Sequence, residues 1–162
     1  MKSLDSDHTK KLIILAVISG ILAGLISSIH HWYGAVEYNT PWRISVSYWI
    51  MGLTLIVYLL LYVYWKNLGN IVGKFAIWLF LFSAVIFQAG FIMFECIYSH
   101  VLKNILFFSG VPLSTLEKLY PSPAYHLPDN LFFEFTGLLQ IIGFVAVWYA
   151  YRVFRNRPWM KR

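Results

Sequence analysis

The stretch LIILAVISGILAGLISSI, from Leu12 to Ile29, runs for eighteen residues without a single charge. An α-helix rises about 1.5 Å per residue, so this stretch crosses most of the ~30 Å hydrocarbon core of a bilayer. It follows Lys10 and Lys11, as the core of a secretory signal would, but it is longer than such cores and no clear small-x-small cleavage site precedes His30. We therefore interpret residues 12–31 as a retained first transmembrane helix.

The composition of the whole chain indicates that lipid is its solvent. Of its 162 residues, 59% are hydrophobic and only 12% are charged, whereas charged residues make up about a quarter of a typical soluble domain. Three further apolar segments lie at about 41–65, 71–99 and 130–151. The predicted fold class is all-α integral membrane, a four-transmembrane-helix bundle that forms a single membrane domain over residues 1–162.

One long connection separates the third and fourth segments, at about 109–128, and it contains four of the six prolines. The sequence STLE at 114–117 resembles the capping box of a short helix. We expect a short amphipathic helix in this outer loop, lying on the membrane surface through Leu113, Leu116, Leu119 and Tyr120.

Lysine and arginine are unequally divided between the two ends of the predicted bundle. Only Arg43, Lys103 and Lys118 lie at the end away from the termini. The other ten are Lys2, Lys10, Lys11, Lys66, Lys74, Arg152, Arg155, Arg157, Lys161 and Arg162. Because cytoplasmic segments carry the basic excess, we expect a multi-pass cell-membrane protein with both termini in the cytoplasm. The net charge of +6 then reflects orientation and lipid headgroups, and no nucleic-acid partner is expected.

Residues capable of metal binding or acid–base chemistry gather at the outer end. His30 and His31 end the first helix, Glu95 and His100 lie in the third, and Glu134 lies about one turn inside the fourth. Imidazole and carboxylate groups are ligands of zinc, copper, manganese and non-haem iron. The predicted metal ligands, to a divalent metal ion, are His30, His31, His100, Glu95 and Glu134. The predicted acid–base or catalytic residues are Glu134, Glu95 and His100.

The spacing on the third helix argues against this site. Glu95 and His100 are five residues apart, which on an α-helix separates them by about 140°. A packing interpretation is that the same histidines and glutamates pair with each other, with Arg43 or with backbone carbonyls to hold the helix ends together. Haem between His30 or His31 and His100 is a further alternative, although no second histidine pair is expected at the inner end.

Within the spans, polar and small residues predict helix packing. Gln88 and Gln140 are expected near the middle of the membrane, hydrogen-bonded to each other. Gly20 and Gly24, four residues apart, are expected to allow a neighbouring helix to approach closely. The single cysteine, Cys96, excludes an internal disulfide and any Cys-x-x-Cys motif.

Two classes of function remain open from the sequence. The first is a membrane-embedded enzyme or metal-binding protein with a His/Glu site facing the extracytoplasmic side. The second is a non-catalytic accessory or anchor subunit that meets a membrane partner, or a second copy of the chain, through its outer loops. A transporter fits less well, because the acidic residues lie at one end of the bundle. No motif names a substrate or decides whether the chain is an enzyme.

Overall fold

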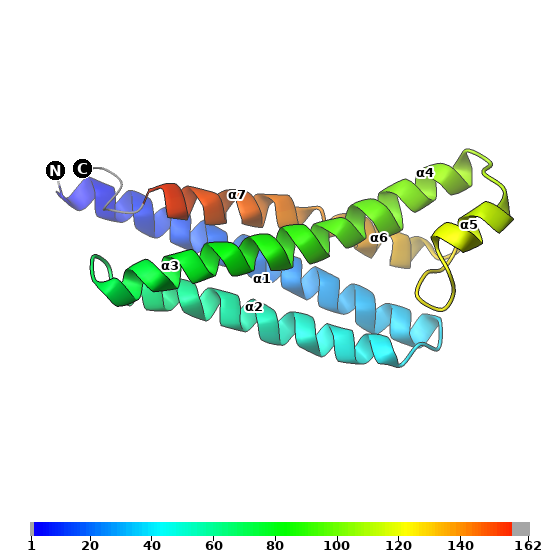
Figure 1. Ribbon diagram of the computed structural model, residues 1–162, viewed down its shortest axis with the longest axis horizontal. Coiled ribbons are helices and arrows are strands. Elements are labelled where there is room, and N and C mark those ends of the chain that lie inside the picture. The colour runs from blue at the N-terminus through cyan, green and yellow to red at the C-terminus, as the bar shows by residue number, and fades with distance from the viewer. Residues whose placement is uncertain (1, 157–162) are drawn as a thin grey trace.

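A computed structural model describes the backbone of residues 2–156 and the side chains of residues 7–156. Over this range the chain is helical, with no β-strand. Helix α1 (Lys2–Glu37) packs against α2 (Trp42–Lys66), and two further helical rods complete an elongated bundle in which α1 begins and α7 ends at the same end (Figure 1). The predicted orientation rests on ten lysines and arginines at the end with the termini. Four of these side chains lie outside the described residues: Lys2, Arg157, Lys161 and Arg162.

The third rod is longer than predicted and changes its helical type along its length. It consists of α3 (Ile71–Ala84), η1 (Val85–Met93), η2 (Glu95–Leu102) and α4 (Lys103–Phe108). Both η1 and η2 are π-helices, whose hydrogen bonds join residues five apart. The rod therefore continues past the predicted end at 99 as far as Phe108.

The fourth rod is divided into α6 (Leu131–Leu139) and α7 (Ile142–Arg155). At the break, the amides of Gln140 and Ile141 bond to carbonyls three residues back, at 3.3 and 3.1 Å. This local 3₁₀-type tightening interrupts the α-helix. The Asn130 side chain caps α6 by accepting a hydrogen bond from the Phe133 amide.

Four helices are long and apolar enough to cross a membrane, at residues 7–37, 42–66, 71–108 and 131–155. Large apolar side chains cover the outside of the bundle; Trp49 is 71% exposed and Leu131 is 87% exposed. A soluble monomer rarely exposes so much contiguous apolar surface. The prediction of four long apolar helices is confirmed, and each is long enough to cross a membrane.

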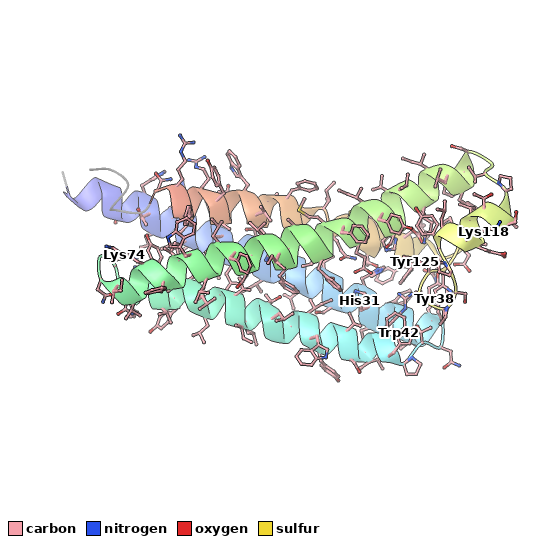
Figure 2. The ribbon with its side chains drawn as sticks, in the orientation of Figure 1. His31, Tyr38, Trp42, Lys74, Lys118 and Tyr125 are labelled. Atoms are coloured by element: carbon pink, nitrogen blue, oxygen red, sulfur yellow. The ribbon has the colours of Figure 1, made fainter. Side chains whose placement is uncertain are left out.

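The interior changes from apolar to polar along the bundle. Near the start of α1 the core is built from aliphatic and aromatic side chains such as Leu61, Ile77 and Phe80. Toward the other end, which carries the labelled His31, Tyr38 and Tyr125 in Figure 2, the buried side chains are largely polar. The polar set includes His30, His31, Arg43, Ser47, Ser99, His100, Lys103, Glu134 and Thr136.

The small residues of α1 allow α2 to approach closely, as predicted. A Cβ atom on Gly20 would overlap the Tyr58 hydroxyl, and one on Gly24 would overlap Thr54. The predicted Gln88–Gln140 hydrogen bond is wrong. Gln88 donates instead to the Tyr58 hydroxyl at 2.8 Å, because close packing at Gly20 brings that hydroxyl into the bundle, and the Gln140 amide makes no hydrogen bond to any described group.

The outer loop contains a short helix, as predicted, but its capping and packing differ. Helix α5 (Leu113–Leu119) begins directly after Pro112, so Ser114 lies inside the first turn and no side chain caps the helix. Leu116 is buried, and the Tyr120 hydroxyl donates to the Tyr98 carbonyl at 3.1 Å. One side of the segment thus packs against the third rod, so the expectation that Leu116 and Tyr120 lie on the membrane surface is wrong, whereas Leu113 and Leu119 are exposed.

Candidate metal centre

The π-helix η2 brings together two residues that an α-helix would separate. With hydrogen bonds five residues apart, a π-helix has about 4.4 residues per turn, so positions i and i+5 lie about 50° apart. Glu95 and His100 therefore point to the same side of the third rod. The expectation that the two residues do not share a face of the helix is wrong, because it assumed α-helical geometry.

Three of the five predicted ligands meet in one cluster. One ligand atom from each of His30, Glu95 and His100 lies within 4.8 Å of the other two. The two imidazole Nε2 atoms are 3.2 Å apart, and His30 Nε2 is 4.0 Å from Glu95 Oε1. Ligands held about 2.05 Å from a tetrahedral zinc ion are about 3.3 Å apart. The two nitrogens already have this spacing, and rotation of the partly exposed Glu95 side chain can bring its oxygen closer.

The hydrogen-bond partner of His30 determines which ring nitrogen carries its proton. His30 Nδ1 lies 3.1 Å from Thr136 Oγ1. The Thr136 hydroxyl donates its only hydrogen to the carbonyls of Phe132 and Phe133, at 2.9 and 3.0 Å. Its oxygen must therefore accept a hydrogen bond from His30 Nδ1. This arrangement leaves Nε2 of neutral His30 unprotonated.

The protonation of His100 is determined in the same way by Glu134. His100 Nδ1 lies 2.9 Å from Glu134 Oε2, and the ammonium group of Lys103 donates to Oε1 at 2.7 Å. The buried Lys103 cation balances the Glu134 carboxylate, so the carboxylate accepts from His100 Nδ1. A carboxylate behind a ligating histidine is the usual outer partner in metal sites, where it orients the ring.

These hydrogen bonds leave two nitrogen lone pairs facing each other. Neutral His30 and His100 each place an unprotonated Nε2 at the 3.2 Å contact. Two acceptors cannot form a hydrogen bond, and both rings are almost fully buried. A cation between them, either a metal ion or one shared proton, makes the contact favourable.

The other two predicted ligands support the cluster from outside. His31 Nε2 lies 2.9 Å from Glu95 Oε2, which leaves Oε1 directed toward His30. Glu134 contacts His100 and is separated from the facing nitrogens by the imidazole ring. The structure therefore places His31 and Glu134 behind the cluster of His30, Glu95 and His100. Cys96 lies outside the cluster, and its thiol donates to the Leu138 carbonyl.

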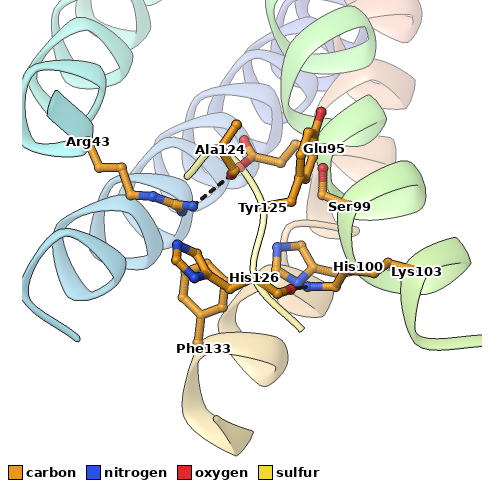
Figure 3. A pocket seen from close by; sticks show the side chains of 9 residues that line it. All are labelled: Arg43, Glu95, Ser99, His100, Lys103, Ala124, Tyr125, His126 and Phe133. Atoms are coloured by element: carbon orange, nitrogen blue, oxygen red, sulfur yellow. Dashed lines mark hydrogen bonds between the residues drawn. The ribbon is translucent and has the colours of Figure 1, made fainter. Parts of the chain in front are cut away.

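A small cavity of about 30 Å³ opens beside the cluster (Figure 3). The residues that line it are Arg43, Glu95, Ser99, His100, Lys103, Ala124, Tyr125, His126 and Phe133. A water molecule needs about 10–15 Å³ of such space, so the cavity accommodates one or two small groups. Haem, which needs a pocket of several hundred Å³, does not fit between these histidines.

The loop from Tyr120 to Asn130 covers the cavity without adding a ligand to the cluster. Lys103 donates to the His126 carbonyl at 2.6 Å, and the His126 ring stacks on Tyr38 with their centroids 3.8 Å apart. Burial, followed by the effect of the Arg43 cation, lowers the pKa of His126. Burial also raises the pKa of the Tyr38 hydroxyl, as does its hydrogen bond to Asp129.

Several residues that build the site carried no functional signal in the sequence. Lys103 was interpreted there only through its charge, and Arg43 also as a packing partner of the histidines and glutamates, whereas Thr136 and Gly137 were not singled out. A Cβ atom on Gly137 would overlap the His100 ring, so this glycine makes room for that ring. Their positions within apolar segments were the only available clue, because polar residues in such segments are rare and often functional.

No family model, curated protein or solved structure matches this chain. The site's geometry is therefore the basis for a functional interpretation.

Proposed function

We propose that this chain is an integral membrane protein, with both termini in the cytoplasm, that binds one divalent transition-metal ion near its extracytoplasmic end. The ligands are His30, His100 and Glu95. The observation that carries the proposal is the pair of facing Nε2 atoms of His30 and His100, which are 3.2 Å apart. The Nδ1–H group of His30 donates to Thr136 and that of His100 donates to Glu134, so neither Nε2 carries a hydrogen.

The donor set favours zinc or ferrous iron. Two imidazoles and one carboxylate are the protein ligands of many catalytic zinc sites and of non-haem iron centres. The cluster contains no thiolate, the soft ligand that selects copper(I). The partners behind the ligands, His31 on Glu95 and Glu134 on His100, also match the outer hydrogen bonds of metal sites.

Three protein ligands leave at least one coordination position open, as in metal sites that act on a substrate. Glu95 and His100 both line the 30 Å³ cavity, so a small molecule there would lie beside the metal. This arrangement supports a reaction or binding event at the ion more than a purely structural metal, whose four positions would be filled by protein.

The same contacts favour a second candidate function, acid–base transfer of a proton. Lys103, Glu134, His100 and His30 form an unbroken series of contacts of 2.7, 2.9 and 3.2 Å. One proton shared by the two Nε2 atoms would replace the metal ion. A ¹⁵N spectrum of the histidines would then show one imidazolium charge distributed over His30 and His100 in metal-free protein.

The first experiment is metal analysis of the full chain in detergent, after loading with Zn²⁺, Fe²⁺ or Co²⁺ and removal of excess ion. We expect one ion per chain and at least 100-fold weaker binding in His30→Ala and His100→Ala. His8→Ala is the matched control, because His8 lies near the start of α1 at the opposite end of the bundle. Absence of stoichiometric metal, or equal loss in all three variants, would overturn the metal proposal.

A further inference from the structure

The cavity beside the proposed metal centre contains a buried cation that forms no ion pair. Arg43 is only 3% exposed, and it forms no ion pair within 4.0 Å among the side chains that the structure describes. Its Nε atom has no hydrogen-bond partner in that region. One terminal nitrogen donates to the Ala124 carbonyl at 2.8 Å, the bond drawn in Figure 3.

Aromatic packing holds the guanidinium group at the cavity wall. Its carbon atom lies 5.3 Å from the centre of the Phe133 ring and 5.1 Å from that of Trp42. A glycine at position 34 provides the space, since a Cβ atom there would overlap Phe133 and lie 3.2 Å from the guanidinium. The group is thus fixed in place, which lowers the entropic cost of binding a ligand.

The charges around the cavity favour an anion once the metal is bound. Lys103 is balanced by Glu134, and Glu95 is shared between His31 and the proposed metal. The divalent ion, Arg43 and Lys103 together carry four positive charges. The carboxylates of Glu95 and Glu134 carry two negative charges, so two positive charges are left in excess. Because unbalanced buried charge is costly, an anion between Arg43 and the ion would stabilise the site.

The size of the cavity limits the anion that it can hold. A volume of about 30 Å³ favours an anion of a few heavy atoms over larger tetrahedral oxyanions such as sulfate and phosphate. The covering loop is held on both sides, because Arg43 donates to the Ala124 carbonyl and Lys103 donates to the His126 carbonyl. These two bonds fix the loop backbone at the cavity wall.

We propose that this cavity binds a small anion of up to about three heavy atoms, of the size of formate or azide, between the Arg43 guanidinium and the metal ion. The inference rests on the proposed metal centre, and it identifies the class of ligand or substrate that the centre accepts. A guanidinium group recognises such an anion by charge and by directed N–H donors.

The test uses the full chain loaded with Co²⁺ in low-chloride detergent buffer, titrated with sodium azide and then with sodium formate. Anion binding at the open position changes the visible absorption of Co²⁺. We expect saturable changes with both anions and none with sulfate. Arg43→Gln should weaken azide binding at least 10-fold, and Arg43→Lys should weaken it less, because it keeps the charge but loses the planar donor fork. Lys118→Gln, which removes an exposed cation of the same end, should bind azide as wild type does.

The outcomes separate the two proposals. Failure of the wild type to take up Co²⁺ would overturn the metal centre and this inference together. Uptake of Co²⁺ without an azide response, or with an equal response in wild type and Arg43→Gln, would overturn the anion site alone. If Arg43→Gln does not take up Co²⁺, the comparison is made with Arg43→Lys, and unchanged azide affinity in that variant overturns the anion site.

Discussion

Replacing Glu134 by glutamine removes one charge from the site at almost constant volume. The carboxylate accepts hydrogen bonds from His100 Nδ1 at 2.9 Å and from Lys103 at 2.7 Å. A glutamine amide can accept only one of them and presents an N–H₂ group to the other donor. Lys103, which is 1% exposed, then has no counter-charge. Removing one member of a buried ion pair costs about 3–5 kcal/mol, so we expect a loss of unfolding free energy in that range.

The same substitution should weaken metal binding, because it releases the His100 ring. Loss of an outer hydrogen bond to a ligating histidine costs about 10- to 100-fold in metal affinity. With free Zn²⁺ at 100 times the wild-type Kd, binding stabilises the wild type by about 2.7 kcal/mol. In Glu134→Gln the same Zn²⁺ concentration should stabilise by only about 0.4–1.4 kcal/mol.

Thermal unfolding in detergent, with and without Zn²⁺, measures both effects, and competition with a coloured chelator gives the affinity directly. Glu117→Gln is the control, since Glu117 is exposed on α5 and should change stability by less than about 0.5 kcal/mol. Adding Lys103→Met to Glu134→Gln should recover stability, by removing the unpaired charge, without restoring affinity. Wild-type stability and Zn²⁺ affinity in Glu134→Gln would refute the role given to this carboxylate.

Three further results are expected. Gly137→Ala should lower Zn²⁺ affinity at least 100-fold in the chelator assay, because its methyl group would overlap the His100 ring, whereas Gly90→Ala, where a Cβ has open space, should leave it unchanged. Burial and the Arg43 cation lower the pKa of His126 in the folded state. The contribution of neutral His126 to stability is therefore complete above the unfolded pKa of about 6.5 and is lost as the pH falls through the folded pKa. The variant His126→Gln should lose less stability than the wild type between pH 7.5 and pH 5, and an equal loss would contradict this. In a Cys96→Ala background, Lys74→Cys and Lys118→Cys should react with a membrane-impermeant maleimide from opposite sides of the membrane, the former from the cytoplasmic side, and labelling from one side would refute the four-span orientation.

The sequence was sufficient to predict the four helices because the signal was strong and local. Long uncharged segments such as residues 12–29 form α-helices in lipid, because an α-helix satisfies all of its backbone hydrogen bonds internally. The third helix was predicted at about 71–99, with apolar sequence that continues to Phe108, and in the structure the helical rod ends at Phe108. In the structure Lys103 is buried and paired with Glu134, so its charge marks the interior of the site.

The site was only partly predictable, since its geometry depends on contacts between distant helices. The histidines and glutamates could be assigned to one end of the bundle from the topology alone. Which of them cluster and which lie behind the cluster depends on individual atoms, such as the Thr136 hydroxyl oxygen that accepts a hydrogen bond from His30 Nδ1. Periodicity contains no information of that kind.

The π-helical segment links the fold to the proposed chemistry. π-Helices are rare, occur mostly as single-turn bulges inside α-helices and are frequent at functional sites. An α-helix through η2 would turn His100 about 140° away from Glu95, so only one of the two could face His30. The π-helix instead directs both toward α1, while the Phe94 side chain between η1 and η2 remains exposed on the outside. Because this helical type occurs at the point where Glu95 and His100 face His30, it supports the metal-binding proposal over the alternative of polar residues paired at helix ends.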